Sequence, residues 1–175
     1  MPDKYDSEVE EVDAFLAEPK TLVDEQPTWT KSARPGEMQA TWGILESGSV
    51  SRAELRFRFS PAFRTEPSIS VLLRPKRPIW RIDLVAPQSW KPNPLGAERY
   101  DLPPMVYGPH SHAWPDNREH VRVNGFGPLP FRRPLPAAIR RLPQALAALA
   151  NDINLTLGPD QRGFDVPPKD DLFDL

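Results

Sequence analysis

Apolar and charged residues alternate through the middle of the chain. The period of two is clearest where Leu55, Phe57 and Phe59 alternate with Glu54, Arg56 and Arg58, a pattern typical of a strand with one buried face. Further strands are predicted at residues 39–45, 69–74 and 79–85, separated by turn-forming residues. Four successive strands without a helix between them predict an antiparallel meander.

Toward the C-terminus the apolar period lengthens to three and four residues. Over residues 136–155 one stripe is formed by Ile139, Leu142, Leu146, Leu149 and Ile153. This spacing predicts a helix that covers one face of the sheet and packs on Trp80, Ile82 and Leu84. Pro143 lacks a backbone N–H, so we expect a kink or a break there.

The predicted fold is α+β, a meander of about four strands covered by this C-terminal helix. A chain of 175 residues, 39% of them hydrophobic, can bury one modest core. A short helix is predicted at residues 7–17, and the polar, proline-containing stretch after it is typical of a linker. We therefore expect an acidic extension and linker over residues 1–36, one domain over residues 37–158 and an acidic tail over residues 159–175.

The net charge of −2 hides a segregation of charge along the chain. Residues 1–26 carry nine acids and two bases, and residues 160–175 carry five acids and two bases, so the segment between them holds 18 bases against ten acids. A basic body of this kind attracts phosphates or an acidic partner. The acidic ends either compete for the same surface or only aid solubility.

Several classes of protein are excluded by what the sequence lacks. No apolar run approaches the roughly 18 residues that a membrane span needs, and the first residues are acidic, so we expect a cytoplasmic protein with no membrane partner. The chain has no cysteine, which removes disulfides and thiolate chemistry. It also lacks a phosphate loop and a serine nucleophile elbow.

The three histidines all lie in residues 86–136, a stretch rich in proline and glycine. Long loops inside a domain are often functional. His110 and His112 are two residues apart, and in an extended segment both rings lie on the same side. They could bind a metal, share acid and base roles, or simply pack beneath a loop.

Arg81 and Asp83 share the strand face opposite Trp80, Ile82 and Leu84. Arg81 could hold a phosphate and Asp83 could orient a histidine or ligate a metal, although the pair would also suit a solvated face. We place His110, His112, Asp83 and Arg81 in one catalytic site. No residue is assigned as a metal ligand, and the sequence leaves the cofactor unknown. Phosphate-binding candidates are Arg56, Arg58, Arg132 and Arg133.

Short motifs carry a family resemblance. They are Arg81-Ile82-Asp83-Leu84, Pro92-Asn93-Pro94-Leu95-Gly96, Pro109-His110-Ser111-His112 and Asn151-Asp152-Ile153-Asn154-Leu155. Most of residues 50–155 resemble an uncharacterised bacterial mobile-element family. More remotely, the order of strands, Arg-x-Asp, a Pro-His-x-His loop and a last helix resembles the TumE-type toxins of toxin–antitoxin systems. The resemblance implies action on RNA or translation and a cognate antitoxin as partner. It also implies that His110 and His112 are the functional pair, with Arg81 and Asp83 beside them.

Two functional hypotheses follow from the sequence. In the first, the protein is a toxin-like enzyme acting on RNA, in which the histidines act on a phosphate held by arginines. In the second, it is a non-enzymatic inhibitor or adaptor from a mobile element that binds a protein partner through charged tails and loops. A cleft that joins the histidines to Arg81 favours the enzyme.

Overall fold

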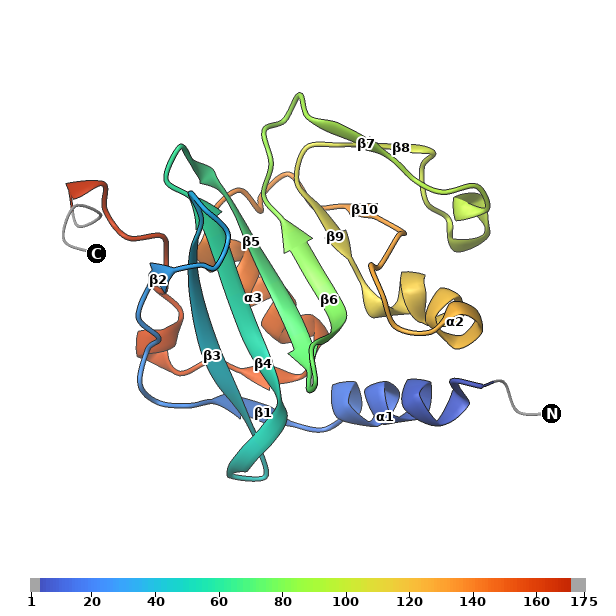
Figure 1. The fold of residues 1–175 in the computed structure, drawn as a ribbon, viewed down its shortest axis with the longest axis horizontal. Coiled ribbons are helices and arrows are strands. Elements are labelled where there is room, and N and C mark those ends of the chain that lie inside the picture. Colours follow the sequence, from blue (N-terminus) through green and yellow to red (C-terminus); the bar gives the residue numbers. More distant parts are fainter. Residues whose placement is uncertain (1–3, 171–175) are drawn as a thin grey trace.

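The centre of the structure, a computed structural model that describes residues 4–170, is a twisted sheet with a helix behind it (Figure 1). Its middle is the antiparallel succession β3 (Met38–Glu46), β4 (Ser49–Ser60), β5 (Phe63–Leu73) and β6 (Arg77–Asp83). This confirms the α+β class and the four expected strands. Buried residues alternate with less buried ones along β3 and β4 and along β5 as far as Val71, so the period seen in the sequence marks the core face there.

The complete sheet has more strands than the sequence predicts. Its order is β10-β9-β6-β5-β4-β3-β1-β11, with β2 paired to β3. The added strands are β1 (Lys20–Leu22), β2 (Thr30–Lys31), β9 (His110–His112), β10 (Arg133–Pro134) and β11 (Leu155–Thr156). Each has only two or three residues, too few to show a period. A separate two-stranded sheet joins β7 (Trp90–Pro92) to β8 (Met105–Tyr107).

Helix α3 (Leu142–Asp152) covers the core face, behind β3 to β6 in Figure 1. The expected stripe and the apolar side of β6 belong to one buried cluster, which includes Leu146, Leu149 and Trp80. The helix begins six residues later than expected. Pro143 lies in its first turn, where a missing N–H removes no hydrogen bond, so the proline marks the start of the helix and no kink forms.

The N-terminal extension differs from the expected linker because it is packed into the domain. Helix α1 (Asp6–Ala17) buries Val9, Val12 and Phe15 to 1% exposure or less. Strand β1 then pairs with β3 on one side and β11 on the other. The apolar residues of this segment are few, but they are fully buried. They stabilise the domain through tertiary contacts, which the local hydropathy of the sequence does not show.

The start of the C-terminal tail is also part of the domain. A short 3₁₀ turn, η2 (Pro159–Gln161), leads to Phe164, which is 4% exposed. Its ring stacks on Trp29 at 5.5 Å and meets the edge of Phe57 at 4.8 Å. Two segments that the sequence analysis places outside the domain therefore meet each other in its core. The last five residues of the predicted tail lie outside the described residues.

The proline-rich stretch of residues 86–136 is more regular than expected. Besides β7 to β10 it contains the 3₁₀ turn η1 (Ala97–Tyr100) and helix α2 (Trp114–Asn124). Helix α2 buries Asp116 and Asn117 beside Trp114 and Val121, so it has no clear apolar stripe to predict it. None of the helices in residues 4–170 is long and apolar enough to cross a membrane.

Candidate active site

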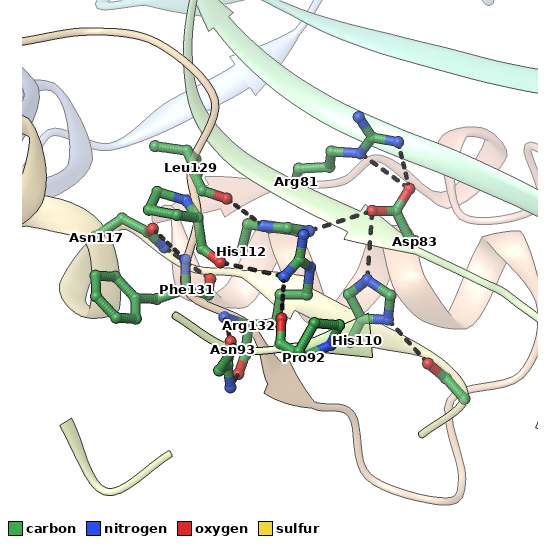
Figure 2. A network of polar contacts seen from close by, with 12 residues as sticks. Arg81, Asp83, Pro92, Asn93, His110, His112, Asn117, Leu129, Phe131 and Arg132 are labelled. Atoms are coloured by element: carbon green, nitrogen blue, oxygen red, sulfur yellow. Dashed lines mark hydrogen bonds and ion pairs between the residues drawn. The ribbon is translucent and has the colours of Figure 1, made fainter. Parts of the chain in front are cut away.

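Two neighbouring strands bring the predicted catalytic residues together on the polar face of the sheet. Strand β9 pairs antiparallel with β6, so that Asp83 lies opposite His110 and Arg81 lies opposite His112. Both pairs point away from α3 because Trp80 and Ile82, which alternate with them, face the core. Figure 2 shows the four side chains converging from these two strands.

Asp83 is the centre of this group. Its Oδ2 atom lies 3.4 Å from Nε2 of His112 and 3.7 Å from Nε2 of His110. Arg81 donates to the other oxygen, Oδ1, from Nε at 2.9 Å and from Nη2 at 2.7 Å. The Asp83 side chain is only 13% exposed. One carboxylate therefore holds a guanidinium with one oxygen and faces two imidazoles with the other.

Backbone carbonyls orient both histidine rings. Nδ1 of His110 lies 2.9 Å from the Gly108 carbonyl oxygen, and Nδ1 of His112 lies 2.5 Å from that of Leu129. A carbonyl oxygen can only accept a hydrogen bond, so Nδ1 is the protonated nitrogen in each ring. Gly108 has a φ of +68°, a left-handed conformation that glycine adopts without strain. Both Nε2 atoms are thereby directed at Asp83 (Figure 2).

Burial and charge act in opposite directions on the acid at the centre. Burial raises the pKa of Asp83, but the contact with His112 and the charge and hydrogen bonds of Arg81 lower it by more, to about 2. Burial lowers the pKa of His110, against the opposing effects of the Gly108 carbonyl and Asp83. The carboxylate is therefore fully ionised near neutral pH.

An open cavity of about 800 Å³ lies over this face of the sheet. We call it the basic hollow; its charged lining is Arg34, Arg56, Arg58, Lys76, Arg81, Lys91 and Arg132, with Asp83. Its floor follows a row of paired residues across four strands, from Arg56 through Ser70 and Arg81 to His112. The small side chain of Ser70 leaves space between the two arginines.

Much of the positive charge in the basic hollow is not neutralised. Arg56 pairs with Glu54 at 2.7 Å, and Arg58 lies 3.5 Å from Glu37. Within residues 4–170, no ion pair is made by Arg34, Lys76, Lys91 or Arg132.

The neighbouring positive charges affect the pKa of Arg58. Burial lowers the pKa of its guanidinium, and the charges of Arg56, Arg34 and Arg81 lower it further, although Glu37 opposes them. A bound anion would relieve this repulsion.

Two asparagines hold the loop that borders the basic hollow. Asn117 is fully buried, accepts from the Phe131 N–H and donates to the Phe131 carbonyl. Asn93 makes the same two hydrogen bonds with the backbone of Arg132: it accepts from the N–H and donates to the carbonyl, both at 2.8 Å. The loop carries the Leu129 carbonyl that orients His112. In the sequence, Asn93 stands out only as part of a family motif and Asn117 not at all, because a contact with a distant loop leaves no local pattern.

The structure separates the four candidate phosphate ligands. Arg56, Arg58 and Arg132 line the basic hollow. Arg133 does not, because its side chain makes two hydrogen bonds to Asp116, at 2.7 and 3.1 Å. The third histidine, His120, lies on α2 and contacts Asn124 and Phe131, apart from the group around Asp83. Arg34, Lys76 and Lys91 complete the lining and were not singled out by the sequence.

The arrangement around Asp83 supports two kinds of chemistry. One nitrogen of each histidine and one oxygen of Asp83 all lie within 4.8 Å of one another, close enough to hold one metal ion. Protonated rings could instead transfer protons to a substrate in the hollow. In both cases the reactive atoms adjoin a basic surface. Comparison of the chain with protein-family models, curated proteins and solved structures gives no match.

Proposed function

We propose that the protein is a nucleic-acid-directed enzyme that binds RNA in the basic hollow and cleaves it at Asp83, His110 and His112. The observation that carries the proposal is the enrichment of seven basic side chains around a single acid, which is itself flanked by two histidines. Phosphates neutralise such a surface, and phosphate contacts supply most of the affinity for nucleic acids.

The lining favours recognition of the backbone over recognition of bases. Among the described residues that line the basic hollow there is no Phe, Tyr or Trp, so these residues supply none of the large aromatic stacking platforms that many single-strand binders use. Its volume of about 800 Å³ falls within the range typical of small-ligand sites. We infer that a short single-stranded segment enters the hollow and that sequence preference is weak.

Cleavage of labelled single-stranded RNA by the purified full chain tests the proposal. Wild type should cut the RNA, and Asp83→Asn should lower the rate by about 10² or more because the central carboxylate is lost. His120→Ala is the matched control, since it removes a histidine outside the group, and its rate should equal that of wild type. Intact RNA with wild type, or cleavage that survives Asp83→Asn, contradicts the proposal.

A second candidate, a non-enzymatic inhibitor or adaptor, is favoured by one observation outside the hollow. Trp90 and Tyr107 are cross-strand partners on the β7–β8 sheet, and they are 55% and 63% exposed. Exposed aromatic pairs are enriched at protein interfaces. If the double variant Trp90→Ala/Tyr107→Ala loses binding to a protein partner, and RNA remains uncut by every variant, the adaptor is the better description.

A further inference from the structure

We propose that Asp83, His110 and His112 form a binding site for one divalent first-row transition metal ion. The ligands would be Oδ2 of Asp83 and Nε2 of each histidine. The metal site stands on its own geometry. The role of its open coordination positions in holding a phosphate and a water rests on the proposed function.

The distances between the three atoms suit a common metal. Metal bonds to nitrogen and oxygen of about 2.0–2.1 Å, at tetrahedral or octahedral angles, place neighbouring ligand atoms about 3.0–3.5 Å apart. The observed separations from Oδ2 are 3.4 Å and 3.7 Å. The nitrogen atoms of the two histidines lie within 4.8 Å of each other, so a shared metal ion would require the two rings to adjust toward it. Both histidines lie on one short strand and Asp83 lies on its neighbour, so the site is built on the sheet and not on a loop.

The hydrogen bonds of the rings point to a cation between these atoms. Because Nδ1 donates to a backbone carbonyl in both rings, Nε2 is the ring nitrogen left to bind a metal. In both rings this atom faces Oδ2 of Asp83. A metal ion satisfies all three, and histidine ligands of metals typically donate their other nitrogen to a carbonyl or carboxylate in this way.

Arg81 completes the pattern. It holds Oδ1 with two hydrogen bonds, at 2.7 and 2.9 Å, and leaves Oδ2 for the metal. A hydrogen-bond partner on the oxygen that does not bind the metal fixes a ligating carboxylate in one orientation. The basic hollow lies over the same face, so open positions on the metal would face the surface that collects phosphates.

The donor set selects the class of metal. Two imidazoles and one carboxylate suit Zn²⁺, Mn²⁺, Fe²⁺, Co²⁺ or Ni²⁺, whereas Mg²⁺ and Ca²⁺ prefer oxygen ligands. Three protein ligands leave at least one position open, as in catalytic metal centres. A metal there would lower the pKa of a bound water and polarise a phosphate oxygen.

The site is tested by titrating the untagged, chelator-treated full chain with Co²⁺, Zn²⁺ and Mg²⁺. Binding is measured by calorimetry and, for Co²⁺, also by the visible absorption of the bound ion. We expect one equivalent of Co²⁺ or Zn²⁺ to bind and Mg²⁺ to bind at least 10²-fold more weakly. His110→Gln and His112→Gln should each lower the affinity at least tenfold and change the Co²⁺ spectrum, while His120→Gln leaves both unchanged.

Thermal melts of the metal-free variants show which of them fold, and the two single variants provide independent tests. Absence of Co²⁺ and Zn²⁺ binding at millimolar concentration, or binding that both variants retain, overturns the site. RNA is absent from these titrations, so failure of the metal site and failure of the proposed RNA cleavage are distinguishable.

Discussion

Asp83 and His110 are cross-strand partners in register on β6 and β9, with Oδ2 of the acid 3.7 Å from Nε2 of the ring. They are 27 positions apart in the chain. The strand pairing therefore joins the Arg-x-Asp and His-x-His motifs into one group.

Arg132 and Arg133 are adjacent in sequence but differ in environment, which provides a matched pair of variants. Arg132 lines the basic hollow and Arg133 pairs with Asp116. If RNA binds in the hollow, Arg132→Ala should weaken RNA binding uniformly across sequences and reduce the salt slope by roughly one phosphate contact.

Arg133→Ala should instead leave RNA affinity unchanged and lower the free energy of unfolding by about 1–3 kcal/mol, because Asp116 is left without its partner. Fluorescence anisotropy at several salt concentrations and urea denaturation separate these effects. Equal losses of affinity in both variants would contradict binding in the hollow.

The ion pair between α1 and α2 should make stability depend on pH. Burial raises the pKa of Asp13, but hydrogen bonds from Arg118 and Trp114 and the Arg118 charge lower it below its ordinary value of 3.8. The folded state then binds fewer protons than the unfolded state, so the contribution is present above about pH 4 and is lost as the pH falls below that.

Asp13→Asn should lower the free energy of unfolding by about 1 kcal/mol at pH 7, a small value because the pair is partly exposed. The difference from wild type should shrink as denaturation is repeated at lower pH. A difference that stays constant down to pH 2 would exclude the ion pair as its source.

The N-terminal helix should be required for stability. Phe15 is completely buried in the core, so Phe15→Ala should lower the free energy of unfolding by about 3–5 kcal/mol. The matched control is Phe63→Ala, because Phe63 is 63% exposed and its loss should change stability by less than about 0.5 kcal/mol. A chain that starts at Gly36 should lose the cooperative thermal transition, and its retention would show that residues 1–35 form a separable extension.

Leu146 measures how tightly α3 covers the sheet. It is 0% exposed within the main core cluster, and Leu146→Ala should lower the free energy of unfolding by about 2–5 kcal/mol. Leu95→Ala is the control, because that side chain is fully exposed. A loss below about half a kcal/mol at Leu146 in chemical denaturation would mean that the helix packs loosely.

The sequence determined the parts of this protein that depend on local periodicity. Residues 53–59 alternate because one face of that strand is buried, and the stripe from Leu142 to Leu149 repeats because a helix has one buried side. The pairs Arg81 with Asp83 and His110 with His112 were also visible, since residues two apart on a strand share a face.

Only the tertiary structure decided that Trp29 and Phe164 belong to the core and how the site is assembled. Strands such as β1 and β11 are too short to show a period. Trp29 and Phe164 lie far apart in the sequence, yet their rings stack on each other. Arg132 and Arg133 are identical in type and adjacent, yet strand and loop geometry alone places one in the hollow and the other on Asp116. Contacts between distant segments set these outcomes, and such contacts leave no local pattern in the sequence.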